Sequence, residues 1–273
     1  MKTRVITGIL LAAFFVPPFV VGSWYLMAIL LLLSVVATYE LFQMYNVQRP
    51  LPKVVLISEL LMSAIMYWSV SGYFMFQYAL EWAFMGVALV LVIGSLLMVF
   101  VDEFDGHAVG DMLMSVLYPS IAFGAIYGLR DYSVHNIGFL FMITISTDVF
   151  AYIVGIRYGK HRLAIKISPK KSIEGSIGGA VFAVLFTMLY LWGFGVENVG
   201  AITINWWSSI LLILVISSLG QIGDLVASKM KRSVGIKDFS NIFPGHGGVM
   251  DRFDSVLFAG LIVMIISQVV TLL

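Results

Sequence analysis

Nine apolar stretches, each long enough to cross a membrane, occupy most of this chain of 273 residues. A membrane-spanning helix needs about 20 mostly apolar residues, because each residue adds about 1.5 Å against a hydrocarbon core of about 30 Å. The stretches lie at residues 5–22, 24–46, 54–73, 82–101, 111–129, 136–157, 177–195, 204–227 and 253–273. The sequence therefore predicts an all-α, polytopic integral membrane protein with about nine transmembrane helices.

The composition excludes several other classes of protein. Hydrophobic residues make up 60% of the chain and charged residues 11%, at a mean hydropathy of +1.00, whereas soluble domains carry about 25% charged residues. This excludes an ordinary cytosolic enzyme and a disordered chain, and the net charge of +1 argues against a nucleic-acid partner. The chain has no cysteine, which excludes disulfides, thiolate metal sites and cysteine nucleophiles.

The basic residues predict the orientation. Except for Arg130, every lysine and arginine lies at the helix end Arg157 or in the segments 1–4, 47–53, 102–110, 158–176 and 228–252. Since cytoplasmic loops are enriched in Lys and Arg, we expect a cytoplasmic N-terminus, and nine spans place the C-terminus on the far side. The first stretch is similar to a signal peptide, but it has no small-residue cleavage site and runs into Pro17-Pro18, so we expect a retained helix. The size of the chain and the lack of a targeting extension indicate a bacterial plasma membrane, with an organelle as the alternative.

Five acidic residues fall within or at the ends of the predicted spans: Glu40, Glu59, Asp148, Asp224 and Asp254. A carboxylate at a helix centre costs at least about 2.5 kcal/mol on insertion scales, so each needs a partner or a cation. Glu40 and Glu59 lie within about two turns of a cytoplasmic helix end, and we expect a structural role for them.

Asp148 lies deeper, about nine residues from the cytoplasmic end of its helix. It shares a helix face with Thr144, Tyr152 and Gly155, at spacings of four, four and three residues. This polar stripe is either a functional surface or a polar contact between helices, and we favour the functional interpretation.

Two cytoplasmic loops carry most of the remaining charge. The first contains Ser168-Pro169-Lys170-Lys171-Ser172-Ile173-Glu174-Gly175, a compact basic turn whose lysines could bind phosphates as point charges. By itself this turn is also explained by the positive-inside rule alone. We therefore divide the membrane domain into residues 1–135, with the first five helices, and residues 136–273, with helices six to nine and the loops 158–176 and 228–252.

The second loop adds paired carboxylates at both of its ends. Asp224 and Ser228 lie four residues apart at the end of the eighth span, and Asp251 and Asp254 lie three apart where the ninth begins. Clustered carboxylates without His or Cys partners suit a hard cation such as Mg²⁺. Neighbouring lysines, arginines and glycines suit phosphates. Together these features suggest phosphoryl or nucleotidyl transfer onto a lipid.

The loop also contains a long motif with fixed spacing, Ser228-x-x-Lys231-Arg232-x(4)-Lys237-Asp238-x(5)-Pro244-Gly245-His246-Gly247-Gly248-x-x-Asp251-Arg252-x-Asp254. This motif resembles the signature of the phosphatidate cytidylyltransferases (CDP-diglyceride synthetases). The resemblance is extended by Asp148-x-x-Ala151-Tyr152-x-x-Gly155, Gly159-Lys160 and Ser168-Pro169-Lys170-Lys171-Ser172-x-Glu174-Gly175. The match covers roughly residues 144–254 and has about a dozen fixed positions. It departs from the family at Ser172, where threonine is expected.

The resemblance implies a nucleotidyltransferase that converts CTP and phosphatidate into CDP-diacylglycerol and pyrophosphate with Mg²⁺. The phosphatidate oxygen is largely ionised at neutral pH, since phosphate monoesters have a second pKa of about 6. It therefore attacks the α-phosphorus of CTP without a strong base, and catalysis consists of positioning and charge neutralisation.

Roles follow from the resemblance as hypotheses. Asp224 and Asp251 hold the Mg²⁺, and Asp148 and Asp254 complete its shell or bind a second cation, Mg²⁺ or K⁺. With Asp224 and Asp251, we count Lys231 and Arg252 as catalytic. The expected substrate-binding residues are Ser168, Lys170, Lys171, Ser172, Glu174, Ser228, Lys229, Arg232, Lys237, Asp238, Gly245, His246, Gly247 and Gly248. The turn from Gly245 to Gly248 is expected to fold over the nucleotide as a lid.

Two other functions compete with this one. An ion-coupled transporter also places acids in its helices, but it does not explain a 25-residue loop of Lys, Gly, His and Asp at one surface. A CTP-dependent lipid kinase would transfer the γ-phosphate. The expected partners are CTP, phosphatidate and membrane lipids, and the sequence leaves a homodimer open.

Overall fold

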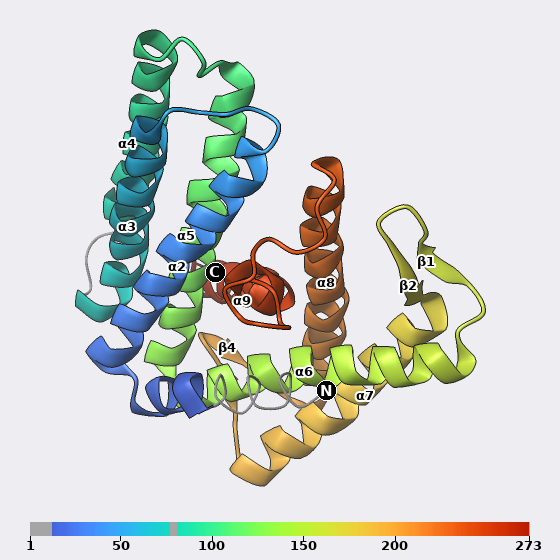
Figure 1. Ribbon diagram of the computed structural model, residues 1–273. Coiled ribbons are helices and arrows are strands. Elements are labelled where there is room, and N and C mark those ends of the chain that lie inside the picture. Colours follow the sequence, from blue (N-terminus) through green and yellow to red (C-terminus); the bar gives the residue numbers. More distant parts are fainter. Residues whose placement is uncertain (1–12, 77–80, 273) are drawn as a thin grey trace. The chain divides into compact units, whose positions relative to one another are not determined.

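The computed structural model describes residues 13–76 and 81–272 (Figure 1). Residues 13–21 are helical. The helices that follow are α2 (Ser23–Asn46), α3 (Lys53–Phe76), α4 (Glu81–Phe100), α5 (Gly106–Tyr132), α6 (Val134–Tyr158), α7 (Ile173–Phe194), α8 (Trp206–Ser233) and α9 (Val249–Leu272). Within the described ranges, 8 helices are long and apolar enough to cross a membrane. They correspond to the second to ninth predicted spans, and the all-α membrane class is confirmed. Of the first predicted span, 5–22, residues 5–12 lie outside the described residues, and residues 13–21 are helical.

Two short antiparallel hairpins interrupt the helices, which the sequence did not predict. Strands β1 (Arg162–Ala164) and β2 (Ser168–Ser172) pair with Arg162 opposite Ser172, and β3 (Asn198–Val199) pairs with β4 (Ile202–Thr203). Both hairpins lie between long helices, where the pairing satisfies backbone N–H and C=O groups. The basic turn that the sequence predicted is therefore an ordered β-hairpin.

The chain forms two compact units. Unit 1 contains residues 1–131 and 233–252, and unit 2 contains residues 132–232 and 253–273. The loop 233–252 thus belongs with the N-terminal helices, although it follows α8 in the sequence. The division between the units passes through α9, between Arg252 and Phe253.

Unit 1 has a polar cluster inside its apolar core. Ser34 on α2, Ser63 on α3 and Ser120 on α5 form a ring of hydroxyls at 3.0–3.2 Å, and Thr38 adds a fourth at 2.9 Å from Ser63. All four side chains are buried. Small hydroxyl residues let helices approach closely in a membrane and satisfy one another's hydrogen bonds, so the cluster fixes how these three helices face each other.

The loops at one end of unit 1 are tied together. Arg49 pairs with Asp105 at 3.0 Å, and the Nε2 group of Gln48 donates to the carbonyl of Ser233 at 3.0 Å. Three of the segments predicted to be cytoplasmic therefore meet at one end of this unit, and the acidic loop 102–105 receives a basic partner that its own sequence lacks.

Arg130, which lies away from the segments predicted to be cytoplasmic, caps a helix. Its Nε and Nη2 groups donate to the carbonyls of Phe19 and Val20 at 2.6 and 2.7 Å. The last carbonyls of a helix have no partner within the helix. Arg130 departs from the enrichment of basic residues in cytoplasmic loops because it serves as a helix cap.

Unit 2 is built around close packing of α6 and α7. A Cβ at Gly175 would lie 2.6 Å from the carbonyl oxygen of Ala151, and a Cβ at Gly179 would lie 2.6 Å from that of Thr147. The pattern Gly175-x-x-x-Gly179 is typical of membrane helices whose backbones touch. The two helices form one support, which carries the β1–β2 hairpin between them.

Candidate functional site

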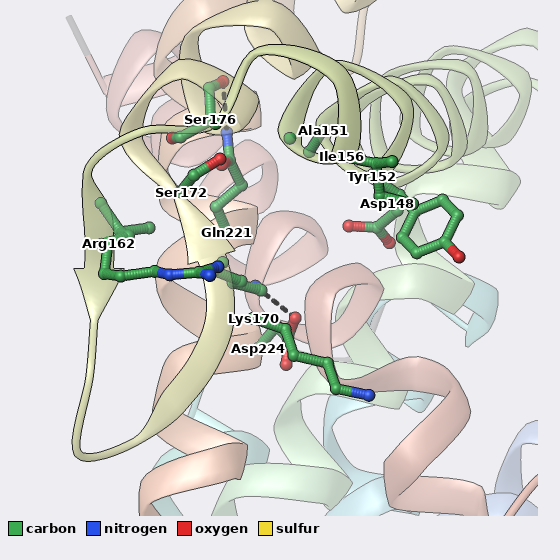
Figure 2. A pocket seen from close by; sticks show the side chains of 14 residues that line it. Asp148, Ala151, Tyr152, Ile156, Arg162, Lys170, Ser172, Ser176, Gln221 and Asp224 are labelled. Atoms are coloured by element: carbon green, nitrogen blue, oxygen red, sulfur yellow. Dashed lines mark hydrogen bonds and ion pairs between the residues drawn. The ribbon is translucent and has the colours of Figure 1, made fainter.

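Unit 2 contains a cavity of about 640 Å³ between α6, the β1–β2 hairpin and the start of α7, with α8 on its other side. Figure 2 shows Asp148 on α6 and Asp224 on α8 facing this cavity, with Arg162 and Lys170 contributed by the hairpin. The cavity is lined by Asp148, Ala151, Tyr152, Gly155, Ile156, Gly159, Arg162, Leu163, Lys170, Lys171, Ser172, Ser176, Gln221 and Asp224. It therefore combines two carboxylates with three basic side chains, beside an apolar helix face.

Both carboxylate oxygens of Asp224 have partners. The ammonium group of Lys171 forms an ion pair with Oδ2, and the hydroxyl of Ser228 donates to Oδ1 at 3.2 Å. The predicted pairing of Asp224 with Ser228 along α8 is thus present. Lys171 comes from β2, so this ion pair also joins the hairpin to α8.

Asp254 lies near the same group of charges. Asp224, Lys231 and Asp148 all act electrostatically on its carboxyl group, and Lys231 itself is only 8% exposed. In the described part of the chain, however, no three His, Cys, Asp or Glu side chains lie close enough together to hold a metal ion. The carboxylates supply the oxygen donors that a hard cation requires, so the chemistry of the donor set fits Mg²⁺.

Two other predicted residues hold the hairpin in place. Ser172 is the N-cap of α7, and its hydroxyl accepts from the backbone N–H of Gly175 at 3.2 Å. The carboxylate of Glu174 accepts from the backbone N–H groups of Lys160 and His161 at 3.0 and 3.2 Å and contacts the His161 ring at 2.6 Å. These contacts explain why a serine and a glutamate follow the lysine pair at this spacing.

Unit 1 carries further predicted residues, which all lie in the loop 233–252. This loop encloses a second cavity of about 460 Å³, which is lined by Lys237, Asp238, Asn241, Gly245, His246, Gly247 and Arg252. A tight turn shapes it, in which the N–H of Phe243 donates to the carbonyl of Gly247 at 2.9 Å. The Nδ1 atom of His246 is buried and has no partner among the described residues. A buried polar atom of this kind marks a position where a bound molecule would complete the hydrogen bonding.

Asp251 organises the base of this loop. Its Oδ2 atom accepts from the backbone N–H groups of Phe239 and Gly248 at 2.8 and 2.9 Å. Gly247 has φ +81°, and a Cβ there would lie 2.7 Å from the same carboxylate oxygen. Position 247 therefore favours glycine for two reasons: its φ is positive, and the Asp251 carboxylate lies too close for a side chain.

The structure brings some of the predicted residues to these two cavities and leaves others outside them. The unit 2 cavity brings together Asp148, Lys170, Lys171, Ser172 and Asp224, and the unit 1 loop brings together Lys237, Asp238, Gly245, His246, Gly247 and Arg252. The residues that line neither cavity are Ser168, Glu174, Ser228, Lys229, Lys231, Arg232, Gly248, Asp251 and Asp254.

The sequence interpretation missed Arg162 and Gln221. Gln221 is buried, donates to the carbonyl of Ser176 at 3.4 Å and lies three residues before Asp224. A glutamine inside an apolar helix, in register with Asp224 and Ser228, was the signal for it. Arg162 has no comparable signal, because its place in the cavity depends on the hairpin.

Comparison with known proteins identifies the family of this chain. The model of the cytidylyltransferase family matches residues 2–270. The phosphatidate cytidylyltransferase of Staphylococcus haemolyticus is 34% identical over 258 residues, which cover 94% of this chain and 95% of that protein. Those of Staphylococcus epidermidis and Staphylococcus aureus are each 35% identical, over 94% of this chain and 95% of the relative. This chain therefore belongs to the cytidylyltransferase family and is a membrane-embedded nucleotidyltransferase.

Proposed function

We propose that this protein transfers the cytidylyl group of CTP to phosphatidate, forming CDP-diacylglycerol and releasing pyrophosphate. The observation that carries the proposal is the cavity of unit 2, in which Asp148 and Asp224 face Lys170, Lys171 and Arg162 beside an apolar helix face. Such a cavity suits a molecule with an anionic head and an apolar tail. The names of the relatives support the same reaction.

The reaction requires little proton chemistry. A phosphatidate oxygen forms a bond to the α-phosphorus of CTP while the bond from that phosphorus to the pyrophosphate oxygen breaks. The attacking oxygen is largely ionised at neutral pH, and the pyrophosphate leaves as an anion. The protein therefore has to hold two anions together, which the basic groups of the cavity would do.

In unit 2, Mg²⁺ would be held by Asp224, with Asp148 and Asp254 completing its shell or binding a second cation. The role of Asp251 as a metal ligand stays a prediction. A bound Mg²⁺ would neutralise charge on the nucleotide phosphates. Lys231 and Arg252 would add positive charge, and the loop cavity around His246 would receive part of CTP.

The placement in the cell is also part of the proposal. The basic loops face the cytoplasm, where CTP is made, and the membrane is a bacterial plasma membrane. The sequence leaves a homodimer open, and cross-linking of the purified protein would test it.

The experiment uses purified protein in detergent–phosphatidate micelles with Mg²⁺ and CTP labelled at either the α or the γ phosphate. Label from the α position in the lipid, with pyrophosphate released, is the expected result. Label from the γ position would mean a lipid kinase. No label in the lipid from either position, with an active control enzyme, would exclude transfer to phosphatidate and would lead to a transport assay in liposomes.

A further inference from the structure

Glu40 is a buried carboxylate on α2 whose partners all lie in the loop 233–252. Its Oε1 atom accepts from the hydroxyl of Ser240 at 2.6 Å and from the backbone N–H of Val249 at 2.9 Å, and its Oε2 atom accepts from the N–H of Met250 at 2.8 Å. Only 1% of Glu40 is exposed. A carboxylate that accepts backbone N–H groups at the start of a helix supplies the partners that the first turn lacks.

Glu40 lies so close to Gly248 that no side chain fits at position 248. A Cβ at Gly248 would collide with Oε1 of Glu40 and would lie 2.6 Å from the hydroxyl of Ser240. The glycine at position 248 is therefore required by the approach of Glu40, because its backbone has no positive φ.

Glu40 and Asp251 each bind different backbone and side-chain groups at the base of the loop. Glu40 holds Ser240 and the first two residues of α9, whereas Asp251 holds the adjacent N–H groups of Phe239 and Gly248. Four of the residues that line the loop cavity, Asn241, Gly245, His246 and Gly247, lie between these fixed points. The contact with α2 therefore helps to hold this part of the cavity wall in place.

We infer that Glu40 is a positioning residue for CTP binding: it anchors the loop 233–252 to the N-terminal helices and holds its cavity in the shape that binds the nucleotide. This inference rests on the proposed role of the loop in binding CTP. It gives the N-terminal helices of unit 1, which carry none of the signature, a part in the reaction.

The test compares Glu40→Gln with Glu59→Gln, a matched control. Glu59 is also buried in unit 1, on the neighbouring helix α3, and it accepts from the hydroxyl of Ser115 at 2.5 Å. Both changes replace a buried carboxylate with an amide, but only Glu40 contacts the loop.

We expect Glu40→Gln to raise the KM for CTP about tenfold, since an amide cannot accept from the N–H groups with both of its polar atoms. The KM for phosphatidate is expected to stay within about twofold. Glu59→Gln should lower the Tm and leave the KM for CTP unchanged.

A third variant, His246→Ala, separates this inference from the proposed function. If His246→Ala raises the KM for CTP while Glu40→Gln lowers only the Tm, the loop binds CTP and the role of Glu40 is overturned. If neither variant changes the KM for CTP, the loop does not bind the nucleotide. The role of Glu40 in CTP binding is then excluded as well. If Glu40→Gln cannot be purified, Ser240→Ala decides, because it removes one donor and keeps both N–H contacts. A rise in the KM for CTP of about two- to threefold is expected for Ser240→Ala, and no rise would overturn the inference.

A double-mutant cycle adds a second measurement. Gly248→Ala should raise the KM for CTP strongly when Glu40 is present, because the new methyl group meets its carboxylate. The same change should have a smaller effect in a Glu40→Ala background, since residues in contact are not additive. Equal effects in both backgrounds would contradict the contact.

Discussion

The ion pair between Lys171 and Asp224 combines a charge of the β1–β2 hairpin with a carboxylate of α8. Both side chains are about one-quarter exposed, at 26% and 25%, so solvent screens the pair only in part. Lys171 therefore has two effects: it neutralises Asp224 and it keeps a positive charge at the wall of the cavity.

We expect Lys171→Ala to lower kcat/KM about tenfold, as for the loss of one charge-assisted hydrogen bond. Lys166→Ala is the control, because Lys166 lies in the turn of the same hairpin, is exposed and pairs with no residue that the structure describes. Kinetics at saturating Mg²⁺ would check this. Equal activity of the two variants would remove Lys171 from the site.

The sequence predicted most of the individual charged residues but not their partners. Asp224, Lys171 and Asp148 were identified by their chemistry and their spacing, and the structure brings all three to one cavity. The partner of Asp224 could not be predicted, because Lys171 lies 53 residues away and reaches it only through the hairpin. The sequence assigned Glu40 a structural role, and its contacts with the loop depend on residues about 200 positions later.

The contact between α6 and α7 depends on small residues along one face of each helix. Close approach of two backbones in a membrane is stabilised by packing and not by the hydrophobic effect, because lipid tails are as apolar as the side chains. A single added methyl group should therefore separate the helices.

Gly179→Ala tests this contact, since its Cβ would lie 2.6 Å from the carbonyl oxygen of Thr147 and 3.0 Å from the Cβ of Ala151. We expect a loss of stability of about 1–3 kcal/mol from overpacking. Gly193→Ala, on the same helix, is the control, because no described atom lies within 4 Å of its Cβ. It should stabilise the helix by about 0.5–1 kcal/mol. Thermal melting in detergent would distinguish the two, and equal shifts would refute the close contact.

The start of α5 gives a prediction for pH. The backbone N–H of Ala108 and the guanidinium of Arg49 hold the pKa of Asp105 below its ordinary value. A lowered pKa means that the unfolded state binds the proton more readily, so this stabilisation is present above the unfolded pKa of about 3.9 and disappears as the pH falls through the folded value. The Tm difference between the natural protein and Asp105→Asn should thus be largest near about pH 7 and should decrease as the pH falls below the unfolded pKa of about 3.9. Arg49→Gln should reduce the difference without removing it, because the Ala108 contact remains. A difference that grows in acid would contradict this assignment.

At the scale of elements, the sequence predicted helices better than the segments between them. Long apolar runs such as 82–101 have no alternative in a membrane, since only helices and closed barrels satisfy the backbone there. The two hairpins were missed because strands of two to five residues leave no periodicity to detect.

The orientation of the whole molecule can be tested because the chain has no cysteine. Single cysteines at Lys166 and Asn198 would lie in the two hairpins on either side of α7. We expect a membrane-impermeant thiol reagent to label Lys166→Cys only from the cytoplasmic face and Asn198→Cys only from the opposite face. Labelling in the reverse sense would invert the predicted topology, and labelling of both from one face would mean that α7 does not cross the membrane.

The anchoring of the last loop by the second helix has a consequence for how the protein is made. Glu40 precedes Ser240, Val249 and Met250 by 200, 209 and 210 residues, and ribosomes add about 5–20 residues per second. The ribosome therefore adds Glu40 roughly 10–40 seconds before it adds the residues whose N–H and O–H groups donate to its carboxylate. A chain that stops before position 240 lacks all three of these donors. The carboxylate of Glu40 in α2 then has none of these hydrogen bonds. The complete contact therefore cannot form before the chain has been synthesised as far as Met250.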